Sequence, residues 1–183
     1  MIELMILGFL ADGPLHGYEL RRRMEQLHGY ARTISDGTLY PAITRMVKAG
    51  LVTREAEAGR AGAQRQTLRL TAAGRTRLLA RLREAEGHDI TDLTRFYVVL
   101  AFLSLLPDQA EQHAVLRRRL AFLEEPAGFF YQGERPLKAS DITDPYRRGA
   151  VLSARALNHT ERAWIRDLLE DAAGGPNAEG DKR

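Results

Sequence analysis

The side chains best suited to chemistry in this sequence are hydroxyl, phenol and basic groups gathered between residues 35 and 51. Apolar residues in this segment recur at the spacing of an amphipathic helix, namely Leu39, Ile43, Met46 and Val47. The opposite face then carries Thr38, Tyr40, Thr44, Arg45 and Lys48. Such groups contact phosphates and base edges in a DNA major groove. The segment predicts a nucleic-acid recognition helix, although on its own the same face is also typical of an ordinary solvated helix.

Turn residues predict where this helix begins and ends. Proline is tolerated in the first turn of a helix, where its missing N–H is not needed, so Pro41 places the start near Thr38. Thr38 or Ser35 supplies the capping oxygen. Gly50 suits the position just past the last helical residue and ends the segment.

The neighbouring segments predict the fold that holds this helix. Ile2–Ala11 is apolar on most sides and predicts a buried helix, and a second helix is expected over His16–His28. Residues 52–56 and 65–70 alternate as two strands around a tip, Gly59-Arg60-Ala61-Gly62. Helix, helix, recognition helix and wing is the order of a winged helix-turn-helix. The Arg60 side chain at the tip either enters a narrow minor groove or belongs to a mobile basic loop with no fixed partner.

Five segments in this order resemble the PadR-type transcriptional regulators. They are Ile2-Glu3-Leu4-Met5-Ile6-Leu7-Gly8-Phe9-Leu10, Gly13-Pro14-Leu15-His16-Gly17-Tyr18-Glu19-Leu20, Gly37-Thr38-Leu39-Tyr40-Pro41-Ala42-Ile43, Ala49-Gly50-Leu51-Val52 and Leu70-Thr71-Ala72-Ala73-Gly74-Arg75. The sequence departs from the family at Leu68, where a tyrosine is usual. Tyr18 matches a family tyrosine and is equally compatible with a core aromatic. The predicted DNA-binding residues are Tyr18, Ser35, Gly37, Thr38, Tyr40, Pro41, Thr44, Arg45, Lys48, Arg60 and Arg65.

The distribution of charge favours the same half of the chain. Residues 1–86 hold 14 Lys and Arg against nine Asp and Glu, a balance of +5, whereas the remainder holds 13 against 15, a balance of −2. Basic charge concentrated on one module is typical of nucleic-acid binding. Since there is no cysteine, the sequence excludes thiolate zinc sites and cysteine nucleophiles. The five histidines lack metal-ligand spacing and no catalytic constellation is recognisable, so we expect neither an enzyme nor a metal or cofactor site.

The C-terminal half predicts a helical dimerisation domain. Ile90–Leu106 is apolar nearly all round, and a helix follows to about Glu125. Residues 126–144 are expected to form a loop or short helices. The last helix, Pro145–Ala172, carries a stripe formed by Ala150, Ala154, Leu157, Trp164 and Leu168, which Glu161 interrupts. The predicted dimerisation residues are Phe96, Val99, Leu103, Leu157, Trp164 and Leu168.

The expected architecture is mainly α with one small β-hairpin, in a cytoplasmic protein without a membrane span. We expect a winged helix domain over residues 1–87, a helical dimerisation domain over 88–173 and a disordered tail over 174–183. Thr71 caps the helix Ala72–Glu86, and Gly87-His88-Asp89 is the expected hinge.

A dimer of such domains reads a palindromic operator, and the family resemblance implies a repressor that a small molecule releases. Phe129, Phe130, Tyr131 and Trp164 line a candidate effector pocket or pack in the core. The alternative is a winged helix that binds protein or RNA instead of a specific DNA sequence.

Overall fold

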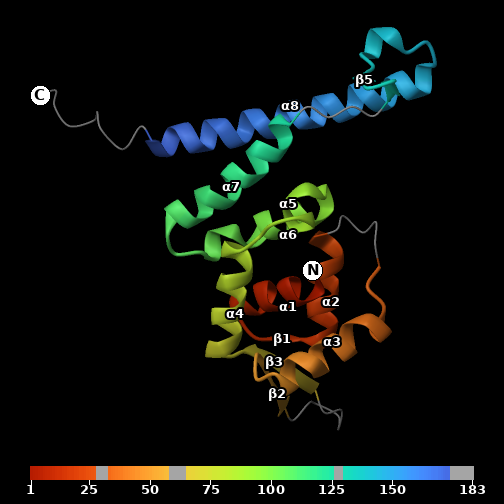
Figure 1. Cartoon of the computed structure of the whole chain (residues 1–183). Coiled ribbons are helices and arrows are strands. Elements are labelled where there is room, and N and C mark those ends of the chain that lie inside the picture. The colour runs from red at the N-terminus through yellow and green to blue at the C-terminus, as the bar shows by residue number, and fades with distance from the viewer. Residues whose placement is uncertain (28–32, 58–64, 126–129, 174–183) are drawn as a thin grey trace, which may run out of the picture. The chain divides into compact units, whose positions relative to one another are not determined.

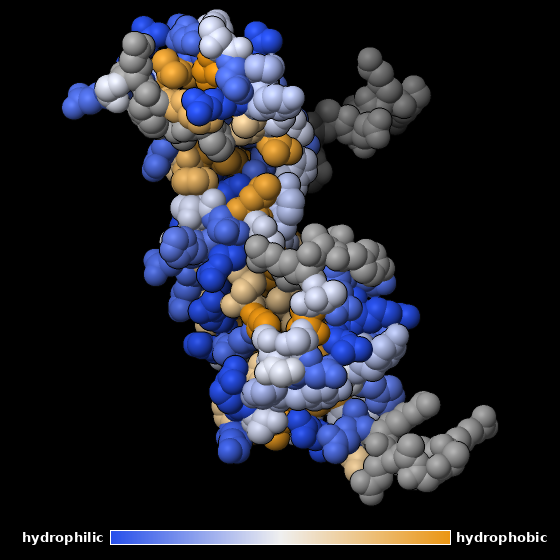
Figure 2. Space-filling model, turned by 90° about the vertical axis from the view of Figure 1, so that its right-hand side faces the viewer, coloured by the Kyte–Doolittle hydropathy of each residue, from blue (hydrophilic) through white to orange (hydrophobic). Residues whose placement is uncertain are grey.

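The chain folds into two compact units, Met1–Val115 and Leu116–Arg183, in a computed structural model that describes residues 1–27, 33–57, 65–125 and 130–173 (Figure 1). On the face drawn in Figure 2, hydrophobic side chains reach the surface only in small groups within a largely hydrophilic surface. No helix in the described ranges is long and apolar enough to cross a membrane. Arg60, Phe129 and the predicted tail lie outside these ranges.

Helix α1 (Ile2–Ala11) is the centre of the first unit, as its all-round apolar sequence predicts. Five of its side chains are almost fully buried: Leu4, Met5, Ile6, Leu7 and Leu10. Helices α2 (Gly17–Leu27), α3 (Asp36–Lys48), α4 (Ala72–Arg83) and α6 (Leu93–Phe102) all contact it (Figure 1). These four helices therefore pack around the same apolar helix, α1.

The small sheet has one strand more than the predicted hairpin. Strands β2 (Val52–Glu57) and β3 (Arg65–Leu70) pair antiparallel and confirm the expected wing. A two-residue strand, β1 (Leu15–His16), pairs with the other edge of β3, which gives the order β1-β3-β2. The prediction that His16 begins the second helix is wrong, because its backbone pairs with Thr67 of β3. Its ring Nδ1 lies 3.4 Å from the carbonyl oxygen of Gln66 and 3.3 Å from the Thr67 hydroxyl.

Helix α3 begins two residues earlier than predicted and ends where expected. Its N-cap is Ser35, so Asp36 and Gly37 already belong to the first turn and Pro41 lies in the second. At the other end, the N–H of Gly50 donates to Val47 and that of Leu51 donates to Met46. These paired bonds form a Schellman motif, and Gly50 adopts the left-handed conformation it needs, with φ of +70°.

The start of α4 is bonded to the end of α3. The Thr71 hydroxyl caps α4 by accepting from the N–H of Gly74 at 2.9 Å, as predicted. The same hydroxyl donates to the carbonyl of Gly50 at 2.7 Å. A Cβ on Gly74 would lie 2.1 Å from the carbonyl oxygen of Leu51, so only a glycine fits this contact.

The apolar segment 90–106 is broken into pieces rather than forming one helix. Helix α5 (His88–Thr91) stops at Asp92, whose side chain accepts from the N–H of Arg95 and starts α6. A 3-10 turn, η2 (Leu103–Leu105), follows. Phe102 lies directly over Gly8 of α1, where an added Cβ would be 2.6 Å from its ring, and meets Phe9 edge-on at 5.1 Å. Because α6 packs on α1 in this way, it belongs to the first unit.

The second unit is built on α7 and a long last helix. Helix α7 (Gln109–Glu124) enters it from the first unit, and α8 (Pro145–Ala173) has the predicted bounds to within one residue. Between them lie a short antiparallel pair, β4 (Tyr131–Gln132) and β5 (Arg135–Pro136), and a 3-10 turn, η3 (Ala139–Asp141). The predicted interruption of the α8 stripe, Glu161, forms a bidentate ion pair with the buried Arg119.

The structure divides the six predicted dimerisation residues into two groups. Phe96, Val99 and Leu103 lie in the interior of the first unit, which takes them off the surface of the folded chain. The three on α8 remain exposed: Leu157 by 57%, Trp164 by 43% and Leu168 by 40%. The packed face of α8 is a different one, with Val151 and Ile165 buried. Any interface formed by the predicted residues therefore rests on α8.

Candidate nucleic-acid interface

Helix α3 has the two faces that its sequence predicts. Leu39, Ala42, Ile43 and Met46 are buried against the rest of the first unit. The polar side chains predicted to face outward are all exposed, namely Thr38, Tyr40, Thr44, Arg45 and Lys48. The apolar face fixes the helix rigidly to the core, and the other face is left to bind a partner.

The N-terminal turn of α3 gathers hydroxyl groups. The Ser35 and Thr38 hydroxyls share a hydrogen bond of 2.9 Å, and no Ser35 side-chain bond caps the backbone. The predicted capping role of the Ser35 side chain is therefore wrong, although Ser35 does hold the N-cap position. Pro41 leaves the carbonyl of Gly37 without the usual helical donor, and Gly37 is exposed to water.

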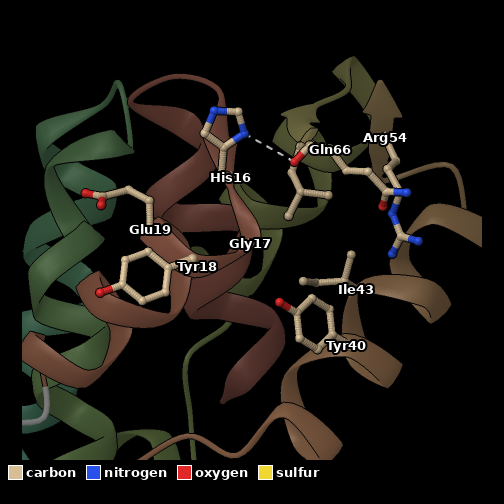
Figure 3. A pocket seen from close by; sticks show the side chains of 9 residues that line it. His16, Gly17, Tyr18, Glu19, Tyr40, Ile43, Arg54 and Gln66 are labelled. Atoms are coloured by element: carbon tan, nitrogen blue, oxygen red, sulfur yellow. Dashed lines mark hydrogen bonds between the residues drawn. The ribbon is translucent and has the colours of Figure 1, made fainter. Parts of the chain in front are cut away.

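Tyr40 and Tyr18 stand at a groove between α3, the start of α2 and the sheet (Figure 3). The groove has a volume of about 580 Å³ and is also lined by His16, Arg54 and Gln66. The ring of Tyr40 packs against Gly17, where a Cβ would be 3.3 Å from ring carbon Cε1. Tyr18 is 65% exposed, so the structure does not bury it as a core aromatic.

The three consecutive arginines of α2 are all engaged within the chain. Arg21 pairs with Asp36 at 2.7 Å and lies over the Tyr18 ring, 5.7 Å from its centroid. Arg22 and Arg23 both donate to Glu19. The hydrogen bond from Arg23, followed by that from Arg22, lowers the pKa of the Glu19 carboxyl below its ordinary value. The run of arginines therefore offers less net positive charge to a partner than its sequence indicates.

Two groove residues, Arg54 and Gln66, were absent from the sequence-based prediction. Both are exposed on the sheet, Arg54 on β2 and Gln66 on β3. Antiparallel pairing puts Arg54 opposite Leu68, and these two wing residues both line the groove. The alternation of each strand could have indicated which residues face outward, but the register that brings them beside Tyr40 comes only from the fold. The side chain of Arg65 lies outside the described part of β3.

The structure describes the side chains of two of the four predicted effector residues, Phe130 and Trp164. Phe130 stacks with Arg147, whose guanidinium carbon lies 5.8 Å from the ring centroid. Trp164 lies partly exposed on α8. Phe129 and the side chain of Tyr131 are outside the described ranges. The effector pocket therefore stays a prediction.

Helix α3 exposes hydroxyl, phenol and basic groups, is fixed to the core by its apolar face, and is flanked by a two-stranded wing. This arrangement defines a winged helix-turn-helix of the DNA-binding class. Residues 6–80 match the model of the transcriptional regulator PadR-like family. The chain therefore carries a PadR-like domain that covers α1 to α4, and proteins of this family are DNA-binding transcriptional regulators rather than enzymes.

Comparison with individual proteins gives more distant matches. The chain is 35% identical over 107 residues to an uncharacterised 37.1 kDa protein of a transposon from Streptomyces fradiae; the match covers 58% of the chain and 27% of that protein. The chain thus spans about a quarter of the length of this relative.

Three solved structures are also similar. A candidate transcriptional regulator of Thermoplasma acidophilum is 31% identical, with a TM-score of 0.41, over 44% of this chain and 75% of that one. Bacillus subtilis PadR in complex with operator DNA is 18% identical, with a TM-score of 0.45, over 92% of this chain and 96% of that one. The same protein in complex with p-coumaric acid is 19% identical, with a TM-score of 0.41, over the same shares.

Proposed function

We propose that this protein is a homodimeric repressor that binds a palindromic operator and is released from it by a small-molecule effector. The observation that carries the DNA-binding part is the exposed polar face of α3 above its buried apolar face. Thr38, Thr44, Arg45 and Lys48 contact base edges and phosphates, and Arg60, from the segment between β2 and β3, probes the minor groove. The protein then acts in the compartment that holds the DNA, which we take to be the cytoplasm.

In this proposal Tyr40 binds a phosphate group of the DNA. Its ring is held against Gly17 while the residue remains 45% exposed beside the groove. A phenol fixed in this way donates a hydrogen bond to a phosphate oxygen without first losing rotational freedom. Tyr18, across the groove, has the same function for a neighbouring phosphate, and Arg54 adds positive charge to the floor.

The homodimer is supported by the exposed apolar residues of α8, because large apolar side chains gathered on one helix face mark protein interfaces. One winged helix contacts few base pairs, whereas two that are held by a common dimer domain bind cooperatively to two half-sites. An effector that binds more tightly to a dimer with a different separation of the two winged helices would lower operator affinity. The size of the effect is set by how much more tightly the effector binds that dimer than the operator-binding one. The residues of the dimer domain would thereby contribute to sequence specificity.

The first experiment is selection of bound duplexes from sheared genomic DNA at about 0.15 M salt. We expect enrichment of a site with two-fold symmetry, whose position names the regulated gene. Enrichment of no sequence by folded protein would contradict sequence-specific binding. Repeating the selection with cell extract then separates a missing ligand from a winged helix that binds protein or RNA.

Substitution of Tyr40 tests the interface at one atom. Tyr40→Phe keeps the ring on Gly17 and removes the donor, so operator affinity should fall by about tenfold or more, because a hydrogen bond to a charged group is worth roughly 1.5–3 kcal/mol. Tyr40→Ala should weaken binding further without unfolding the protein. Arg60→Ala should weaken binding and reduce the slope of log K against log salt by about one.

The control for Tyr40→Phe is Tyr97→Phe, since Tyr97 is exposed to nearly the same extent, 47%, on α6. Binding is measured by fluorescence anisotropy on the selected site, and melting temperature confirms that each variant is folded. Unchanged operator affinity in both Tyr40→Ala and Arg60→Ala would remove this assignment of the interface.

A further inference from the structure

His16 stands at the edge of the groove between α2, α3 and the sheet, which Figure 3 shows from close by. Its side chain is half-buried, and its backbone pairs with Thr67 of β3. The next residue, Gly17, begins α2 and lies against the ring of Tyr40. Strand pairing on one side and the start of a helix on the other therefore hold the imidazole in the groove that the proposed phosphate contacts line.

The two ring nitrogens of His16 have different surroundings. Nδ1 lies 3.4 Å from the carbonyl oxygen of Gln66, which can only accept a hydrogen bond, and 3.3 Å from the hydroxyl of Thr67. We therefore assign the proton of the neutral ring to Nδ1. Nε2 has no hydrogen-bond partner among the residues that the structure describes, and in Figure 3 it points away from Gln66. The neutral ring thus presents a lone pair at Nε2, and the protonated ring presents an N–H.

A phosphate oxygen distinguishes these two states of the ring. It carries negative charge and accepts hydrogen bonds, so it is repelled by a nitrogen lone pair. Protonation of Nε2 replaces this repulsion with a charge-assisted N–H···O bond. The added positive charge also releases a counterion from the DNA when it contacts a phosphate. Imidazole held in this way is a phosphate ligand in one protonation state only.

Among the described residues that line the groove, only His16 is expected to change its charge between about pH 5 and 8. The other ionisable side chains there are Tyr18 and Glu19 of α2, Tyr40 of α3 and Arg54 of β2. Phenols and guanidinium groups keep one charge state over this range. Hydrogen bonds, first from Arg23 and then from Arg22, lower the pKa of the Glu19 carboxyl, so it stays ionised there. The Glu19 carboxylate favours a proton on His16 and the Arg54 guanidinium opposes one, and neither effect varies with pH.

We propose that His16 is a phosphate ligand of the DNA interface that binds only in its protonated form. DNA binding then takes up a proton at Nε2 for each bound copy of the chain. By linkage, uptake of a proton on binding makes the affinity rise as pH falls and weaken as pH rises. This inference rests on the DNA-binding part of the proposed function and adds to it a residue and a dependence on pH.

The test is fluorescence anisotropy of the full chain on a duplex of mixed sequence, at about pH 6 and about pH 8, over a series of salt concentrations. A mixed-sequence duplex is sufficient because phosphate contacts do not depend on the base sequence. Affinity should be about tenfold higher at the lower pH, as expected for one charge-assisted hydrogen bond. The slope of log K against log salt should also be steeper there by about 0.9 for each bound copy.

Two substitutions of His16 separate its charge from its hydrogen bonding. His16→Gln keeps a polar side chain without a titratable group, so its affinity should stay at the high-pH level at both pH values. His16→Arg carries a permanent charge, so its affinity should stay at the low-pH level. The matched control is His88→Gln, since His88 is an exposed histidine of α5 outside the groove, and it should keep the full pH dependence of the parent. Melting temperature confirms that each variant is folded.

Nuclear magnetic resonance of the imidazole nitrogens examines the unaltered protein, with the His16 signals assigned by their loss in His16→Gln. Below saturation with protons, Nδ1 should carry the hydrogen. The midpoint of the His16 titration should move to higher pH when the mixed-sequence duplex is added. A midpoint that saturating duplex leaves in place would overturn the proposal, and so would a His16→Gln variant that keeps the pH dependence of the parent.

Failure of this inference is distinguishable from failure of the proposed function. A protein that selects a two-fold operator, yet binds the mixed-sequence duplex equally well at both pH values, retains its function and loses the role of His16. A folded chain that binds no duplex at either pH loses both.

Discussion

Gly74 shows how a single residue fixes the junction between the recognition helix and the helix that follows the wing. Its backbone lies so close to the carbonyl of Leu51 that a Cβ would approach the oxygen to 2.1 Å. The amide of Thr71 donates to the same carbonyl at 3.1 Å, and the Thr71 hydroxyl caps α4. These contacts join the turn after α3 to the first turn of α4, so the orientation of α3, the proposed recognition helix, depends on them.

We expect Gly74→Ala to lower the free energy of unfolding by about 1–3 kcal/mol, because the backbone oxygen cannot move away as a side chain could. The control is Gly149→Ala in α8, where nothing lies within 4 Å of the added Cβ. That substitution should stabilise the protein by up to about 1 kcal/mol through helix propensity. Urea unfolding measures both, and equal effects in the two variants would contradict the steric argument.

At the scale of elements, the ion pair between Arg119 and Glu161 joins α7 to α8. The two side chains are 3% and 11% exposed, and two hydrogen bonds of 2.7 and 2.8 Å connect them. Arg119 also lies over the ring of Phe122, 5.4 Å from its centroid. A buried charge of this kind is tolerated only while its partner is present. The pair therefore fixes which face of α8 turns toward α7 and which remains exposed.

Arg119→Met should cost about 3–5 kcal/mol of stability, because it leaves the Glu161 carboxylate buried without its partner. The double variant Arg119→Met with Glu161→Leu should recover most of this loss. Arg166→Met serves as the control, since Arg166 pairs with Glu124 at the surface and should contribute less than about 1 kcal/mol. Urea unfolding that showed equal losses in the two single variants would place the ion pair among ordinary surface contacts.

For the whole molecule, the proposed dimer makes the distance between half-sites a property of the C-terminal unit. Because each half-site alone is bound weakly, most of the operator affinity comes from binding both at once. A fixed separation of two recognition helices also fixes the face of the DNA on which both half-sites must lie.

Inserting about five base pairs between the half-sites should therefore lower affinity by about a hundredfold, to the level of one half-site, since it turns the second half-site to the opposite face of the duplex. Fluorescence anisotropy with a single half-site duplex provides the reference. Undiminished affinity for the lengthened site would show that the two DNA-binding units are not rigidly spaced.

Local signals in the sequence were sufficient to predict most helices and strands of the first unit. Gly50, the Thr71 cap and the alternation of residues 65–70 each act within a few residues, and the structure has the turn, the cap and the strand where they predict them. The exposed face of α3 follows from helical periodicity alone. The bounds of α8 in the second unit were likewise predicted to within one residue, although Glu161 interrupts its apolar stripe.

Features that depend on distant residues were not predictable in this way. His16 joins a strand because β3, some 50 residues later, supplies its partner. Asp92 is a local exception: it looks like a charge inside an apolar helix, but its side chain accepts from the N–H of Arg95 and caps a new helix. Nothing in the periodicity of α8 told which of its two apolar faces would be buried, since Glu161 becomes an inward residue only through Arg119.

The contact of Gly8 with Phe102 restricts which substitutions these two positions can accept during evolution. The ring of Phe102 occupies the volume that any side chain at position 8 would need. In a lineage that keeps α6 against α1, a larger residue at position 8 becomes viable only after the aromatic ring has been exchanged for something smaller. The two positions should change together across related genomes, and the glycine should be dispensable in relatives that end before α6.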